Sequence, residues 1–146
     1  MLINIDKRIS PQLLFILAQM GHGDEIAVVD ANFPAVSTAA HCITKEPIDM
    51  MGVDAPKCIE LITKLMPLDT FTEFGILRME IDGAPNELGD VHKDVVTVLD
   101  HVSGDAGQGS IERQIFYKRS KAAFAVVQVS EIRPFGCFLL RKGVIF

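Results

Sequence analysis

Apolar residues recur every three or four positions in four segments of the chain, and this spacing predicts a helix in each. The segments cover residues 10–20, 54–67, 86–102 and 111–124. The first two open with an N-cap residue and a proline in the first turn, which is a typical helix start. The third contains β-branched residues that favour a helix less, and the fourth carries a basic face.

Short, nearly continuous apolar runs lie between the helical segments and predict strands that are covered on both faces. These runs cover residues 25–30, 75–81, 125–131 and 135–146. Residues 42–44 are expected to form one further, brief strand.

The alternation of strands and helices predicts a single α/β domain over residues 1–146. We expect three layers, α/β/α, around a central sheet that is mostly parallel or mixed. One glycine-rich stretch, SGDAGQGS at 103–110, suits neither regular element and is expected to be a loop. The sequence contains no internal repeat, linker or second domain.

The composition is that of an ordinary globular protein, with 49% apolar and 23% charged residues. The mean hydropathy of +0.29 is high for a small monomer that has no membrane span, so we expect the surplus at subunit interfaces. A net charge of −5 argues against nucleic acid or an anionic membrane as a partner. Three cysteines without a CxxC pair, and no leader-like segment, favour reduced thiols and a cytoplasmic protein.

A histidine between two glycines is the most distinctive local feature, in the stretch GHGDEIAVVD at 21–30. A lone loop histidine is most often solvated, but flanking glycines reduce bulk and permit backbone angles that suit close contact with a ligand. Imidazole also titrates near neutrality, so His22 is a candidate acid or base. Asp30 follows the apolar run where α/β sheets usually place ligands, although an aspartate there can simply cap a turn.

The motifs of several other reaction classes are missing from the sequence. It has no GxGxxG or phosphate loop for a nucleotide, no GxSxG elbow, and four histidines without metal-ligand spacing. We therefore expect neither a cofactor nor a metal. Arg113 and Tyr117 lie on the basic helix, whose charged face is usually just solvated. Tyr117 is the one tyrosine of the chain, and beside a site it can position a ligand or donate a proton.

Three stretches in this order resemble the signatures of the fucose mutarotase/ribose pyranase family (RbsD/FucU): MGHGDEIAVVDANFP, FYKRSKAAFAVV and FGCFLLRKGV. The likeness spans nearly the whole chain and is closer to the fucose branch. It implies a cofactor-independent isomerase that interconverts anomers of a free monosaccharide, L-fucose or a related sugar, by acid–base opening and closure of the ring. It also implies a ring-shaped homo-oligomer, often a decamer, with sugar sites at subunit boundaries.

On this resemblance, His22 matches the catalytic histidine, Asp30 a sugar-binding aspartate and Arg113 a sugar-binding arginine. The family's closing Tyr-Gly-Asn, which touches the sugar, falls on Phe135-Gly136-Cys137. These changes remove a hydroxyl and an amide, and two lost hydrogen bonds would weaken sugar binding about 10- to 100-fold. The general base stays open between Asp30, a water and another carboxylate.

The altered Phe135 and Cys137 keep alternatives to a fucose mutarotase open. One is a sugar-binding or transport-associated homologue with weakened or no turnover, and another is a pyranase acting on a ribose-like sugar. A protein that serves only in assembly has least in its favour, because His22 and Asp30 are both retained.

His22 and Asp30 are expected to lie near opposite ends of the strand predicted at 25–30. Eight fully extended residues span about 26 Å, which is too far for both side chains to hold one small ligand. Either the chain around His22 curls back, or two subunits together form the site. The second arrangement agrees with the apolar surplus and is the one we expect.

Overall fold

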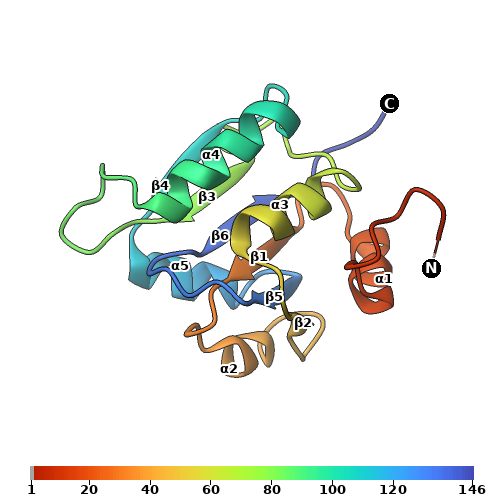
Figure 1. Cartoon of the computed structure of the whole chain (residues 1–146), viewed down its shortest axis with the longest axis horizontal. Coiled ribbons are helices and arrows are strands. Elements are labelled where there is room, and N and C mark those ends of the chain that lie inside the picture. The colour runs from red at the N-terminus through yellow and green to blue at the C-terminus, as the bar shows by residue number, and fades with distance from the viewer. Residues whose placement is uncertain (1) are drawn as a thin grey trace.

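A six-stranded sheet between two layers of helices forms the protein in the computed structural model, which describes residues 2–146 (Figure 1). The strands are β1 (Glu25–Val29), β2 (Ile48–Met50), β3 (Ile76–Met79), β4 (Gln108–Ile111), β5 (Ala125–Val129) and β6 (Phe138–Arg141). The helices are α1 (Pro11–Gln19), α2 (Ala35–Ala39), α3 (Ala55–Thr63), α4 (Asp90–Val102) and α5 (Arg113–Ser120). The predicted three-layer α/β/α fold is confirmed.

The sheet is mixed and has the strand order β2-β5-β1-β6-β3-β4. β1 pairs in parallel with β5, β2 with β5, and β3 with β4, whereas β6 runs antiparallel to both of its neighbours. Five strands therefore end at one edge of the sheet, where β6 begins. The opposite edge receives the beginnings of those strands and the end of β6, so the two edges present different sets of loops.

Each face of the sheet has its own apolar core, because successive side chains of a buried strand point to opposite faces. Ile26 and Val28 of β1 pack with α1, α3 and α4, while Ala27 and Val29 pack with α2 and α5. Figure 1 shows α3 and α4 on one side of the sheet and α2 and α5 on the other. All four of these β1 side chains have no solvent-exposed surface, as predicted for a strand covered on both faces.

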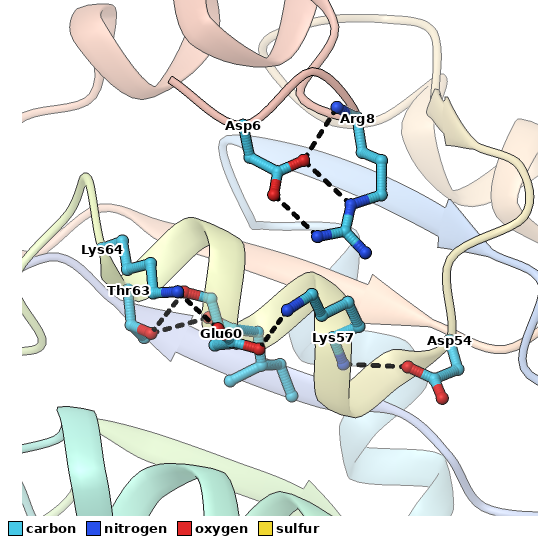
Figure 2. A network of polar contacts seen from close by, with 8 residues as sticks. Asp6, Arg8, Asp54, Lys57, Glu60, Thr63 and Lys64 are labelled. Atoms are coloured by element: carbon cyan, nitrogen blue, oxygen red, sulfur yellow. Dashed lines mark hydrogen bonds and ion pairs between the residues drawn. The ribbon is translucent and has the colours of Figure 1, made fainter. Parts of the chain in front are cut away.

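The predicted helix starts are confirmed for α1 and α3. Leu13 N donates to the Ser10 hydroxyl at 3.1 Å, and Lys57 N donates to Asp54 Oδ1 at 2.9 Å. Figure 2 shows that α3 also carries a polar surface row on which Lys57 and Lys64 both bind Glu60. Such exposed pairs contribute little stability.

Three expectations about local structure are wrong or incomplete. Residues 42–44 are bends, and the edge strand β2 lies a few residues later. The stretch 103–110 is not all loop, because its last residues belong to β4. There Gly109 is required by contact, since a Cβ at this position would lie 2.6 Å from the Phe74 ring. The short α2 was not expected, because five residues give too little periodicity.

The third predicted helix begins later than its apolar pattern suggests, at Asp90 with Gly89 as N-cap. Leu88, which fits the apolar stripe in the sequence, is 40% exposed and lies before the helix. Among the helices of residues 2–146, none is long and apolar enough to cross a membrane.

Candidate active site

A pocket of about 200 Å³ opens at the edge of the sheet where the parallel strands end. Five residues of the predicted site line it: Asp30, Arg113, Tyr117, Phe135 and Cys137. Asp30 follows β1, Arg113 and Tyr117 lie on α5, and the other two directly precede β6. Gly136 lies in the chain between Phe135 and Cys137. We call this pocket, with these residues, the Asp30 pocket.

Asp30 is held in one orientation from two sides and is 9% exposed. Its Oδ1 accepts from Asn32 N at 2.9 Å, and its Oδ2 accepts from the Cys137 thiol at 3.3 Å. Burial, together with the Asp30 charge, raises the pKa of Cys137 well above its usual value, so the thiol keeps its proton. Cys137 thus serves as a donor to Asp30, which leaves the other lone pairs of the carboxylate for a ligand.

A cationic and aromatic wall formed by α5 faces Asp30. Arg113 Nε donates to both carboxylate oxygens of Asp82, at 3.0 and 2.9 Å, and this ion pair raises the pKa of the guanidinium. The Tyr117 ring stacks on Phe33 with centroids 5.2 Å apart, and the Arg113 guanidinium lies 6.0 Å from the Tyr117 ring centre. Because Asp82 engages Nε, the terminal nitrogens of Arg113 are the ones that can reach a ligand.

The loop Phe135-Gly136-Cys137 is held by His92 and packs closely against Glu131. Phe135 has a φ of 60°, which is uncommon for a residue with a large side chain, and its carbonyl accepts from His92 Nε2 at 2.9 Å. A Cβ on Gly136 would lie 2.7 Å from Glu131 Cγ, so no larger residue fits there. The loop brings Phe135 and Cys137 to the lining of the pocket.

His22 is not in the Asp30 pocket, and it lies at the opposite edge of the sheet, before β1. Its side chain is 45% exposed, and its ring meets Phe71 edge-on with centroids 5.4 Å apart. Gly23 has a φ of +87°, and a Cβ there would lie 3.1 Å from the Arg141 guanidinium. The expected need for glycine is therefore confirmed at Gly23. At Gly21 a Cβ would meet nothing closer than 3.7 Å, so that glycine is not required by space.

Asp69 is the partner of His22 and was missed by the sequence reasoning. Its Oδ1 lies 3.0 Å from His22 Nε2 and also accepts from Phe71 N, while its Oδ2 accepts from the Thr72 hydroxyl and from Arg141 Nε. Burial raises the pKa of this carboxyl, but the hydrogen bonds from Thr72, His22 and Phe71 N outweigh that effect and lower it to about 2. Asp69 is therefore a carboxylate at neutral pH, and it accepts the Nε2 proton of the imidazole.

Asp69 also takes part in a chain of ion pairs with Arg141, Glu25 and Arg119. Arg141 binds Asp69 with Nε at 3.2 Å and approaches Glu25 with Nη1 at 3.7 Å, and Arg119 in turn binds Glu25. The cluster joins side chains from four separate parts of the chain, around residues 22–25, 69, 119 and 141, so no local sequence pattern could have located it. Within residues 2–146, no three His, Cys, Asp or Glu side chains are grouped as metal ligands.

One chain thus carries two candidate half-sites, at opposite ends of β1. The Asp30 pocket offers a carboxylate, a guanidinium, a phenol and an aromatic ring. The His22–Asp69 pair offers a half-exposed imidazole, a group that can donate or accept a proton, beside a buried carboxylate. The separation expected from the sequence is confirmed, and the chain around His22 does not curl back to Asp30.

Comparison with known proteins gives consistent matches over nearly the full length. The model of the RbsD / FucU transport protein family matches residues 3–145. The human protein named fucose mutarotase is 42% identical over 94% of this chain and 90% of its own length. The L-fucose mutarotase of Haemophilus influenzae is 35% identical over 99% of this chain and 97% of its own length. The crystal structure of the Streptococcus pneumoniae fucose mutarotase in complex with L-fucose superposes with a TM-score of 0.87, at 33% identity over 99% of this chain and 100% of that one.

Proposed function

The chain belongs to the RbsD / FucU transport protein family, and we propose that it is an isomerase that interconverts the anomers of a free monosaccharide, L-fucose or a related aldose. One observation carries this proposal. The side chains that the resemblance assigns to the sugar come together in a pocket of about 200 Å³. That volume suits a single pyranose ring, since larger pockets of 300 Å³ and more hold drug-sized ligands.

Mutarotation needs only proton transfers and a bond rotation. The anomeric hydroxyl loses a proton to the general base, which is Asp30, a water or another carboxylate, while the ring oxygen gains one. The open aldehyde then turns about one bond, and the ring closes by the reverse proton transfers. In our assignment Asp30 accepts hydrogen bonds from sugar hydroxyls, and Arg113 and Tyr117 donate to them. Phe135 covers an apolar face of the ring, and the main chain of Gly136 and Cys137 lines the remaining wall.

His22 is the proposed acid–base group, and Asp69 supports it. Because Asp69 engages Nε2, the proton passes between Nδ1 and the ring oxygen of the sugar. A buried carboxylate at 3.0 Å holds the ring in one orientation and stabilises the imidazolium that donates the proton. A positioned acid or base of this kind typically contributes about 10²–10⁴-fold to the rate.

We propose that His22 of one protomer completes the Asp30 pocket of a neighbour. The separation of the two half-sites along β1 supports this, and so does Phe71, an aromatic side chain beside His22 that is 65% exposed in the single chain. Repetition of such a head-to-tail contact closes a ring, in keeping with the homo-oligomer that the resemblance implies. Each protomer of the ring would be a single domain. We place the protein in the cytoplasm, where its three buried free thiols stay reduced.

A second candidate function is sugar binding without turnover. Phe135 has no hydroxyl to offer, and the Cys137 thiol is already engaged by Asp30, so the sugar has fewer donors in this pocket than the family pattern provides. A ribose-like substrate, with pyranose and furanose forms interconverted, is the corresponding alternative for an active enzyme. Both alternatives predict weak binding of L-fucose.

Saturation-transfer NMR between the α and β anomeric protons distinguishes these functions, with fucose, ribose, galactose and rhamnose as substrates. We expect the wild type to accelerate exchange of at least one of these sugars and His22→Ala to abolish the acceleration. The matched control is His101→Ala, an exposed histidine in the last turn of α4, which should leave exchange unchanged. Line broadening without added exchange in the wild type would identify a binding protein and refute the enzyme.

A further inference from the structure

A second cavity, of about 240 Å³, lies between α4 and the strands β3 and β4, on the other face of the sheet from Tyr117 and Phe33. It shares no lining residue with the Asp30 pocket. Val95 and Leu99 of α4 and Phe138 of β6 give it an apolar wall, and Arg78 lines it from β3. The cavity therefore combines one cation with an apolar surface.

The Arg78 guanidinium has an unused hydrogen-bond donor in this position. Its Nη2 donates to the Pro85 carbonyl at 2.7 Å, while its Nη1 is buried and has no hydrogen-bond partner within the described part of the chain. A buried donor without an acceptor costs about 1–3 kcal/mol, so a native protein usually supplies a partner. Burial lowers the pKa of Arg78 and the negative charge of Glu80 offsets part of that effect, but guanidinium still stays protonated at neutral pH.

Two other polar side chains of the cavity, those of His92 and Ser110, are already engaged, and Gln108 lines it from an exposed position. His92 Nδ1 accepts from Gly89 N at 3.2 Å, so in the neutral ring the proton sits on Nε2, which donates to the Phe135 carbonyl. The Ser110 hydroxyl donates to Glu80 Oε1 at 2.8 Å. Arg78 Nη1 is therefore the buried donor of this lining that lacks a partner, and the missing partner is an acceptor.

We propose that this cavity is a second binding site, for a small aliphatic carboxylate, with the carboxylate against the Arg78 guanidinium and the chain against Val95, Leu99 and Phe138. A carboxylate matches the planar donors of a guanidinium. The apolar wall disfavours inorganic phosphate, which would leave most of its oxygens without donors. A volume of about 240 Å³ holds roughly eight water-sized units of about 30 Å³, enough for a branched acid of about five carbons.

The test is an NMR titration of the intact protein with 3-methylbutanoate, followed through backbone amide shifts, with 3-methylbutanamide as the uncharged probe of equal shape. We expect saturable shifts along α4, β3 and β4 with the acid, and binding at least about 10-fold weaker with the amide. Arg78→Met keeps most of the side-chain length and removes the charge, and it should weaken binding of the acid about 10- to 100-fold. Arg113→Met, in the Asp30 pocket, is the control and should bind the acid like the wild type.

Three results would overturn the proposal. They are an absence of saturable shifts, equal binding of acid and amide, and shifts confined to the Asp30 pocket. If Arg78→Met does not fold, Val96→Phe replaces it, because Val96 lines the same cavity from a half-exposed position where a ring would fill the space. Unchanged binding in that folded variant would also reject the site. Since binding is measured without turnover, the outcome does not depend on the proposed isomerase activity.

Discussion

Replacement of Asp69 by asparagine tests whether the buried carboxylate serves catalysis or only the fold. The side chain is fully buried, and it accepts four hydrogen bonds, two on each oxygen. Asparagine keeps one acceptor oxygen. If that oxygen continues to serve His22 and Phe71 N, the amide NH₂ faces the donors of Thr72 and Arg141, which both lose their acceptor.

The cost to stability should be moderate because both stranded donors retain another partner. Thr72 also donates to the Phe74 carbonyl at 3.2 Å, and Arg141 also approaches Glu25. The main loss is one charge-assisted hydrogen bond, worth about 1.5–3 kcal/mol. For a domain of this size that lowers the unfolding midpoint by about 3–10 °C.

The loss of catalytic rate should be larger than the loss of stability alone would cause. A neutral amide holds the imidazole about half as strongly as a carboxylate does and cannot stabilise its charged form. We therefore expect Asp69→Asn to lower the anomer exchange rate about 10- to 100-fold at saturating sugar, with KM changed much less. The measurement is saturation-transfer NMR at several sugar concentrations, together with a thermal melt.

The matched control is Asp94→Asn, an exposed carboxylate that pairs with Arg133 on the surface. It should keep both the rate and the midpoint of the wild type. If Asp69→Asn lost stability but exchanged anomers as fast as the wild type, Asp69 would be structural only, and the proposed acid–base pair would be wrong.

Further predictions concern the glycine loop, the thiols and acid stability. Gly23→Ala should destabilise the protein by about 1–2 kcal/mol in denaturant unfolding, because of its positive φ and its contact with Arg141, whereas Gly21→Ala should be nearly neutral. Cys137 should not react with a thiol reagent at pH 8 in the native protein but should react once unfolded, since burial raises its pKa. The folded pKa of Asp69, about 2, lies below its ordinary 3.8, so its contribution to stability is present above about pH 4 and is lost as pH falls towards 2. The difference in melting midpoint between wild type and Asp69→Asn should therefore shrink over that pH range.

Local patterns predicted the elements whose signals are local. The caps Ser10 and Asp54 and the apolar run at 25–30 placed the starts of α1, α3 and β1 within a residue, although α3 ends at Thr63, before the predicted stop at Pro67. β4 was not predicted, because its sequence contains Gly109 and glycine is typical of loops. In the structure Gly109 is needed for the close contact with Phe74. The antiparallel course of β6 was also hidden, since it depends on pairing with two strands far away in the chain.

The residues of the candidate site also fall into two groups, those that a local sequence pattern pointed to and those that only the folded chain brings together. Asp30 and Arg113 were assigned to the sugar from the resemblance, and both line one pocket. Asp69 was not identified, because it lies 47 residues from His22 and joins it only through the folded chain. The role of Cys137 also needed coordinates: the sequence suggested a lost amide, whereas the structure places a thiol that donates to Asp30.

The most direct test of the shared site mixes two inactive variants, His22→Ala and Asp30→Asn. The two proteins are unfolded together at equal concentration, refolded, and assayed for anomer exchange by NMR. If each site takes His22 from one protomer and Asp30 from its neighbour, random assembly restores about one quarter of the wild-type sites. A mixture that stays as inactive as its two components, although it assembles normally in light scattering, would contradict the shared site.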